Sequence, residues 1–297
     1  MDPEDTSPIV SFSRDGEEFV LDSGDEQAPS EGFAATLIYG MQGVGLPPVE
    51  VSSETRVGGH GNVVRGVRYG ARDVYVPFLM EAGSTAELSE KRRELTRLLA
   101  PHRGQVTVRI QDPATGTDRT IEGYFKDGLE GNLSEGYHGS WQAVGLTFEC
   151  NDPMWSGPWR RKELRIAPGV KPFLSDTVPF FPVILNQSNA SGNFEVDIAG
   201  DEPVLPVWEI TGPGKDLRIS AGKKRWVEID GTLRAGETLT YNAKTGRMTP
   251  DRWDDTSART RPFALGPGPE TIAISMVEAT PDSVVAMTFR ERYLEGY

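Results

Sequence analysis

The sequence contains very little cysteine and histidine, the residues that build disulfide frameworks and zinc sites. Only 1 of its 297 residues is cysteine and 3 are histidine. Cys150 permits no internal disulfide and lies in a strand-like stretch, where we expect it to be a small buried hydrophobe. Because His60, His102 and His138 are not paired at ligand spacing, the sequence predicts no metal site.

Long apolar runs are also missing. Nothing approaches the ~20 apolar residues of a membrane helix. The stretch Met1–Pro8 is acidic and lacks the apolar core of a signal peptide. We therefore expect a soluble protein that is made in a cytoplasm and does not insert into membranes.

The common enzyme motifs are absent as well. There is no Gly-x-Ser-x-Gly elbow. Gly43-Val44-Gly45 is followed by prolines at the place where a dinucleotide-binding helix should open. We predict no catalytic residue and no cofactor. A glycosidase carboxylate pair stays open as an alternative, because the fold rather than the spacing sets its geometry.

Negative charge is present in excess and is unevenly distributed. The formal net charge is −13, which argues against a protein that wraps duplex DNA. Residues 1–31 contain ten acids and one base, whereas residues 56–109 contain ten bases and five acids. We interpret residues 1–32 as a separate acidic segment. The favoured interpretation is a solvated tail, and the alternative is an arm that docks on a basic neighbouring subunit.

One segment has the pattern of a helix, and most others have that of strands. Ser84 and Glu87 form a capping box, leucines recur on one face, and Pro101 ends the pattern, which predicts a helix over 85–99. Elsewhere apolar residues alternate with period two. We expect such strands around 74–78, 106–110 and 141–150, and later at 180–185, 194–198, 207–210, 217–220, 226–230, 237–241, 271–276 and 284–292.

The pattern predicts a mainly β protein with two domains. The first, over residues 33–155, has antiparallel strands with one buried face and a single helix. The second is a β-sandwich or jelly roll over 179–297. Residues 156–178 are expected to link them. Trp208, Trp226 and Trp253 could form a sugar-binding platform in the second domain, although core packing is the default for tryptophans in strands.

The order and spacing of several short stretches resemble the distal tail proteins of long-tailed phages with non-contractile tails, also called phage tail or minor tail proteins. The resemblance covers roughly residues 33 to 293. Two features depart from it: Pro269-Glu270 replaces an expected asparagine, and the acidic segment has no counterpart. The matching stretches are His60-Gly61, Val74–Phe78, Leu98–Pro101, Gly104–Val108, Arg119–Gly123, Gly128–Glu130, Trp141–Trp155, Pro206–Pro213, Leu233–Leu239, Ala264–Gly268 and Phe289–Tyr293.

This resemblance implies a structural component at the distal end of a phage tail, assembled in the host bacterial cytoplasm. The first domain would be a β-sandwich with one flanking α-helix. It would close into a homo-hexameric ring between the tail tube protein and the hub protein of the tail tip, which carries the receptor-binding protein. The second would be galectin-like. DNA would pass through an acidic lumen without specific binding. The alternative function is a lectin-like module that binds host cell-wall glycans.

The ring hypothesis also suggests an interface. Arg56, Arg65, Arg68 and Arg72 flank a glycine-rich, strand-prone stretch. We expect this stretch to form a hairpin arm whose arginines reach a neighbouring subunit, because heterologous contacts of this kind close rings.

Overall fold

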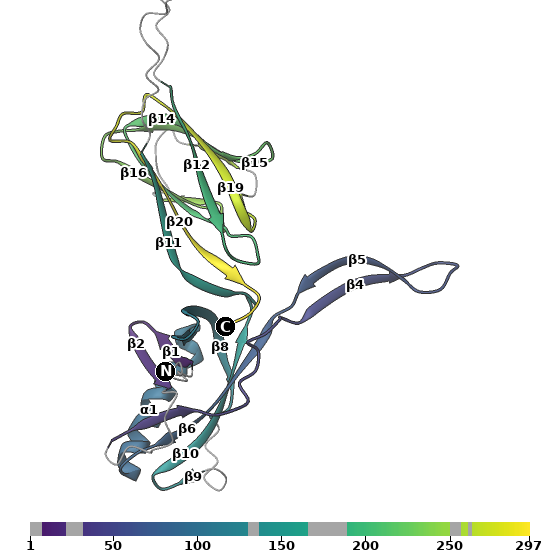
Figure 1. Cartoon of the computed structure of the whole chain (residues 1–297), viewed down its shortest axis with the longest axis vertical. Coiled ribbons are helices and arrows are strands. Elements are labelled where there is room, and N and C mark those ends of the chain that lie inside the picture. The colour runs from purple at the N-terminus through teal and green to yellow at the C-terminus, as the bar shows by residue number, and fades with distance from the viewer. Residues whose placement is uncertain (1–7, 22–31, 130–136, 166–188, 250–256, 261–262) are drawn as a thin grey trace, which may run out of the picture. The chain divides into compact units, whose positions relative to one another are not determined.

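The computed structural model describes residues 8–21, 32–129, 137–165, 189–249, 257–260 and 263–297 (Figure 1). They form two units. The first unit comprises Met1–Gly157 together with Tyr293–Tyr297, and the second comprises Pro158–Arg292. Among the described residues, no helix has the length and apolarity needed to cross a membrane.

The first unit is built on antiparallel strands that share β8 (Thr117–Asp127). The first half of β8 pairs with β7, and its second half pairs with β10. The strand orders are therefore β2-β1-β7-β8 on one side and β8-β10-β6-β3 on the other. The remaining strands of this unit are β1 (Ile9–Arg14), β2 (Glu17–Leu21), β3 (Ala34–Leu37), β4 (Val49–Thr55), β5 (Asn62–Tyr69), β6 (Arg72–Glu81), β7 (Val106–Asp112), β9 (Tyr137–His138), β10 (Trp141–Cys150) and the start of β11 (Trp155–Arg165).

Aromatic rings fill the core between these strands. Phe12 lies 5.2 Å from Phe148 and 6.0 Å from Phe78, measured between ring centroids. The alternation in β10 is confirmed, because every second side chain from Gln142 to Cys150 is buried. Each large apolar side chain buried in this way stabilises the fold by about 1.5–3 kcal/mol.

The predicted helix is confirmed as α1 (Thr85–Leu99). Ser84 Oγ accepts a hydrogen bond from Glu87 N at 3.2 Å, and Glu87 accepts one from Gly83 N at 3.1 Å. The helix buries a leucine face against the core, consisting of Leu88, Leu95, Leu98 and Leu99. A short 3₁₀ turn, η1 (Pro101–Arg103), follows it.

The prediction of a separate acidic segment over residues 1–32 was wrong for the part that the structure describes. Strand β1 pairs with both β2 and β7. Phe12 and Leu21 are fully buried in the core of the first unit. The many acids masked a short period-two pattern, in which Val10, Phe12, Phe19 and Leu21 are buried. The rest of the segment, residues 1–7 and 22–31, lies outside the described residues.

The second unit is an antiparallel β-sandwich. A five-stranded sheet of order β12-β19-β14-β15-β18 packs through one apolar core against strands ordered β17-β16-β13-β20-β11. The predicted mainly β fold is thus confirmed, while the expected strand at 180–185 lies outside the described residues. The strands are β12 (Asn189–Ile198), β13 (Val207–Thr211), β14 (Gly214–Ala221), β15 (Arg225–Leu233), β16 (Thr238–Asn242), β17 (Arg247–Thr249), β18 (Ser257–Thr260), β19 (Gly268–Val277) and β20 (Val284–Tyr293).

The boundary between the units differs from the predicted linker over 156–178. Residues 155–165 form strand β11, and residues 166–178 lie outside the described residues. The carboxyl-terminal residues 293–297 pack on the first unit rather than the second. Gly296 N donates to Val44 O at 2.7 Å, and a Cβ on Gly296 would lie 2.8 Å from the buried Trp155 ring. The chain therefore passes between the two units twice.

Candidate functional site

The most exposed element of the first unit is the β4–β5 hairpin. Its strands pair with each other and with no other described strand. Every residue of β4 is exposed, as is every residue of β5 except the half-buried Tyr69. Gly58 and Gly61 adopt positive φ angles of 76° and 83° in the connecting turn, a conformation that glycine accepts without strain. The predicted hairpin is confirmed (Figure 1).

One face of this hairpin carries ion pairs between its own strands. Arg68 Nε donates to Glu50 at 2.7 Å. Arg65 donates to Glu54 from Nε at 2.9 Å and from a terminal nitrogen at 2.6 Å. These cross-strand pairs satisfy both arginines internally, and such exposed pairs contribute at most about 1 kcal/mol each.

The opposite face of the hairpin is apolar. Val49 lies opposite Tyr69, Val51 opposite Val67, and Ser53 opposite Val64. A register shift between Ser52 and Ser53 places Val64 and Val67 on the same face, although they are three residues apart. Val51, Val64 and Val67 remain 57%, 57% and 64% exposed. Because exposed apolar patches are common features of interaction sites, this face is a candidate interaction surface.

The four arginines of the predicted interface therefore have different roles. Arg65 and Arg68 belong to the charged face of the hairpin, and Arg56 is exposed where its turn begins. Arg72 was wrongly included, because it is only 2% exposed and cannot meet a neighbour. It points inward from β6 and donates to three backbone carbonyls, those of Gly43 at 2.9 Å, Gly45 at 2.8 Å and Leu294 at 2.9 Å.

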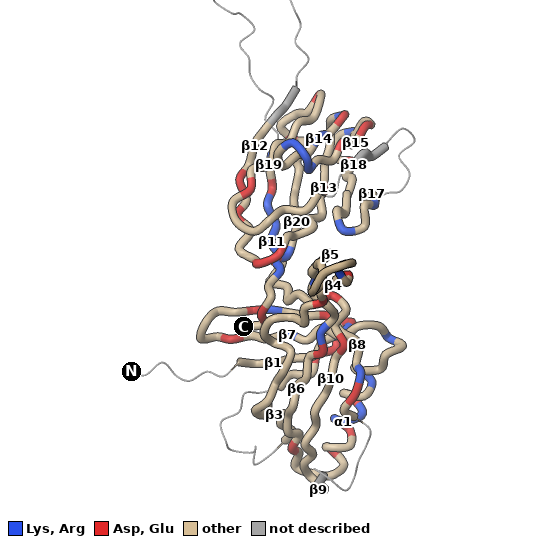
Figure 2. Tube along the Cα trace, turned by 90° about the vertical axis from the view of Figure 1, so that its right-hand side faces the viewer, with Lys and Arg blue, Asp and Glu red and all other residues tan. Residues whose placement is uncertain are grey.

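A second surface of the first unit is an acidic groove between β2 and α1. It has a cavity volume of about 310 Å³ and is lined by Glu17, Glu18, Phe19, Glu94, Arg97 and Leu98. The nearly buried Phe19 and Leu98 form its apolar floor. Glu17 is bound by Arg103 at 2.8 Å, and Glu94 by Lys91 at 2.9 Å. Acidic and basic residues both lie along α1 (Figure 2). This groove could not be predicted from the sequence, because its two elements are far apart in the chain.

The three tryptophans of the predicted sugar platform do not come together among the described residues. Trp208 is fully buried, with its ring centroid 5.6 Å from that of Phe263, so its assignment as a sugar contact was wrong. Its strand neighbour Ile210 points into the same core. Trp226 is half-buried, and the Arg218 guanidinium lies 5.5 Å from its ring centroid. Trp253 lies outside the described residues.

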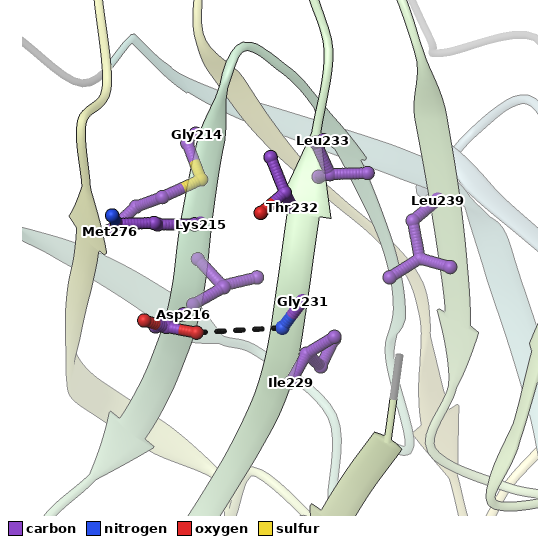
Figure 3. A pocket seen from close by; sticks show the side chains of 10 residues that line it. Gly214, Lys215, Asp216, Ile229, Gly231, Thr232, Leu233, Leu239 and Met276 are labelled. Carbon is purple, nitrogen blue, oxygen red and sulfur yellow. Dashed lines mark hydrogen bonds between the residues drawn. The ribbon is translucent and has the colours of Figure 1, made fainter. Parts of the chain in front are cut away.

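A small cavity of the second unit lies between β14 and β15 and is bordered by Met276 and Leu239 (Figure 3). Asp216 has a φ of 50° there, and its carboxylate accepts a hydrogen bond from Gly231 N at 3.5 Å. The cavity volume is about 10 Å³, which holds about one water molecule and is far too small for a sugar ring. Among the described residues, no three His, Cys, Asp or Glu side chains gather as metal ligands would.

Part of the first unit is similar to a known family of domains. Residues 36–127 match the family model of the phage tail protein RIFT-related domain. This stretch contains the β4–β5 hairpin, α1 and the shared strand β8. A comparison with curated protein sequences yields no match.

Two solved structures extend the likeness over the whole chain. The Dit protein (gp 19.1) of phage SPP1, described as a paradigm of hub adsorption apparatus in phages that infect Gram-positive hosts, matches with a TM-score of 0.59 and 15% identity; the match covers 95% of this chain and 98% of that one. A chain of the phage P2 baseplate in its activated, calcium-bound conformation matches with a TM-score of 0.53 and 10% identity, covering 96% and 98%. The resemblance to distal tail proteins is thereby confirmed at the level of the fold.

Proposed function

We propose that the protein is a structural, non-enzymatic distal tail protein of a long-tailed phage, with six copies closing into a ring. The ring would join the tail tube protein to the hub of the tail tip and its receptor-binding protein. DNA would pass through the lumen, where the net charge of −13 favours passage without binding. The second unit would be the galectin-like domain of the resemblance.

The observation that carries this proposal is the uncovered apolar face of the β4–β5 hairpin. An isolated two-stranded hairpin is marginally stable in water, and its exposed valines gain free energy only when another surface removes them from water. In the proposed ring the hairpin packs on a different surface of the next copy, which is a heterologous contact. Heterologous contacts that close produce rings.

The ring contact that we propose is apolar rather than ionic. Arg65 and Arg68, which the sequence suggested as contacts, already have partners on their own hairpin. By contrast, Val51, Val64 and Val67 on the other face remain exposed to solvent. No observation among the described residues favours the lectin alternative, because Trp208 is buried and the cavity of the second unit admits no sugar.

Changing both Val51 and Val67 to serine tests the proposal. We expect wild-type protein to form hexamers and the double variant to remain monomeric in light scattering over a range of concentrations. The free energy of unfolding of the monomer should change by less than about 0.5 kcal/mol per site, because both side chains are exposed.

The matched control changes Arg65 and Arg68, on the other face of the same hairpin, to serine. We expect this variant to assemble nearly as well as the wild type. Assembly by the valine variant and loss of assembly in the arginine variant would contradict an apolar contact. A wild type that stays monomeric at every concentration would count against a ring that forms in solution.

A further inference from the structure

The β4–β5 hairpin is joined to its unit at two places. Residues 70–71 connect β5 to β6, and a longer stem, residues 43–48, connects β4 to Gln42, which forms a bridge with β6. Because the strands of the hairpin pair only with each other among the described strands, other contacts must hold this stem. We propose that residues 293–297, the C-terminal segment, hold the stem and thereby fix the direction in which the hairpin projects. This inference goes beyond the proposed ring, because it concerns the conformation of a single copy.

The C-terminal segment binds the stem both directly and through an arginine. Val44 O of the stem accepts a hydrogen bond from Gly296 N at 2.7 Å. The stem carbonyls on either side of it accept hydrogen bonds from Arg72 at 2.9 Å and 2.8 Å. The same buried guanidinium donates to Leu294 O at 2.9 Å. Three consecutive carbonyls of the stem are therefore held, and Figure 1 shows the end of the chain beside the base of the hairpin.

The rest of the stem transmits this restraint to the hairpin. Pro47 and Pro48 directly precede β4, and proline fixes the backbone φ angle. Pro48 O also accepts a hydrogen bond from Gly70 N at 2.8 Å, which ties the stem to the residues that follow β5. A stem that is bound at residues 43–45 and stiff at its prolines leaves the hairpin little freedom to swing.

The C-terminal segment has an anchor of its own on β8. Arg119 donates to Glu295 O at 2.6 Å and to Tyr297 O at 3.2 Å, and its guanidinium lies 3.8 Å from the centroid of the Tyr293 ring. These contacts all go to the C-terminal segment and not to the stem or the hairpin. Arg119 is therefore a positioning residue, and its removal reaches the hairpin through the C-terminal segment.

A fixed direction has a consequence for binding. A surface that is already held in one orientation loses less conformational entropy when it associates with a partner. The apolar face of the hairpin is thus presented in a preorganised form. The C-terminal segment begins at Tyr293, the last residue of β20, so the final strand of the second unit and the stem of the hairpin are linked by a few residues of continuous chain.

Single-molecule energy transfer in isolated full-length chains tests the inference. Dyes are attached to Val57→Cys, in the turn of the hairpin, and to Ser89→Cys in α1, which are both exposed positions. The native Cys150 is buried, and this desolvation raises the pKa of its thiol to about 12, so it stays unlabelled. We expect the wild-type background to give one narrow peak of transfer efficiency.

Arg119→Met removes the anchor of the C-terminal segment and leaves the stem residues unchanged. We expect the transfer peak to broaden, because the hairpin then samples several directions. Hydrogen exchange of the Gly70 amide should become about tenfold faster, the change expected from the loss of one charge-assisted hydrogen bond. Arg109→Met is the matched control. Arg109 is a similarly half-buried arginine on the adjacent strand β7, but it donates to Asp118 at 2.8 Å, and its removal should leave the peak and the Gly70 exchange unchanged.

Gly296→Ala provides an independent second variant. Its Cβ would lie 2.8 Å from the buried Trp155 ring, so the C-terminal segment must shift away from Val44 O. We expect the same broadening of the transfer peak and the same faster exchange at Gly70. The exchange of the α1 amides should stay unchanged in both variants, which shows that the unit remains folded.

The outcomes are independent of the proposed ring, because single chains are observed. A narrow peak and wild-type exchange at Gly70 in both variants would overturn the inference and leave the ring proposal intact. An equal rise in exchange at Gly70 and throughout α1 would also overturn it, because the C-terminal segment would then stabilise the whole unit rather than direct the hairpin. Broadening confined to the two variants supports it, whether or not the wild type assembles into hexamers.

Discussion

At the scale of single residues, Arg72 has an unusual position, because it is a buried cation held by carbonyls. Its acceptors belong to the loop before β4 and to the carboxyl terminus, 222 residues away. Hydrogen bonds from a charged group contribute about 1.5–3 kcal/mol, and unsatisfied carbonyls add a further cost when the group is removed. Arg72 therefore joins three distant parts of the first unit.

We expect Arg72→Met to lower the free energy of unfolding of the first unit by about 3 kcal/mol. Hydrogen–deuterium exchange in increasing urea, followed on peptides of the first unit, measures this loss. Arg68→Met removes an exposed arginine from the hairpin. This control should change the free energy of unfolding of the first unit by less than about 0.5 kcal/mol. Equal losses in the free energy of unfolding from the two substitutions would show that the burial of Arg72 adds nothing to stability.

The pairing of Glu270 with Arg225 gives the second unit a pH dependence. Both terminal nitrogens of Arg225 donate to this carboxylate, at 2.6 Å and 2.8 Å, and Gly266 N donates at 3.0 Å. These bonds hold the pKa of Glu270 below its usual value of 4.5. The stabilisation is therefore complete above that value and is lost as the pH falls through the lower pKa of the folded state.

Glu270→Gln should remove this contribution. The difference between wild type and variant in the free energy of unfolding should be largest near pH 7 and should shrink as the pH falls from 5 to 3. Urea unfolding of the second unit across this range provides the measurement. A difference that stays constant with pH would mean that the ionised carboxylate is not what stabilises the fold.

At the scale of elements, the capping box of α1 is local enough to be read from the sequence, and its contribution can be measured. Ser84→Ala removes the acceptor for Glu87 N, and we expect it to lower the free energy of unfolding of the first unit by about 1 kcal/mol. Ser89→Ala, at an exposed position inside the same helix, should raise it slightly because alanine favours helix. A loss of similar size at both sites would argue against the capping interaction.

The β4–β5 hairpin shows that a local sequence pattern can predict paired strands without determining which side chains share a face. Its glycine-rich turn and β-branched strands predicted two paired strands, and this prediction is confirmed. Which side chains share a face depended on the register shift between Ser52 and Ser53. A slip of one residue moves a side chain to the other face of a strand. The sequence alone therefore suggested the arginines as contact residues, whereas the structure shows that the valines form the exposed apolar face.

At the scale of the whole molecule, the carboxyl terminus completes the first unit. Arg119 donates to Glu295 O at 2.6 Å and to Tyr297 O at 3.2 Å, and its guanidinium lies 3.8 Å from the Tyr293 ring centroid. Gly296 packs against Trp155. The first unit thus consists of two segments separated in the sequence by the entire second unit.

Truncation after Arg292 should therefore destabilise the first unit, although most of that unit lies far from residue 292 in the sequence. We expect the first unit to lose about 3–5 kcal/mol, because Arg72 and Arg119 lose acceptors and Trp155 loses its cover. The second unit should keep its unfolding midpoint. Calorimetry with exchange on peptides from both units distinguishes them, and a loss confined to the second unit would contradict this assignment of the terminus.

The sequence by itself determined the local features of this protein: the helix over 85–99 with its cap, the alternation of most strands and the two-domain β organisation. These depend on periodicity and on contacts within a few residues. Only the tertiary structure decided which faces are covered. It buried Trp208 and Arg72, brought strands β1 and β2 of the acidic amino-terminal segment into a core, and returned residues 293–297 to the first unit. Each of these outcomes depends on partners far apart in the chain, and a period-two pattern defines a face without identifying what packs against it.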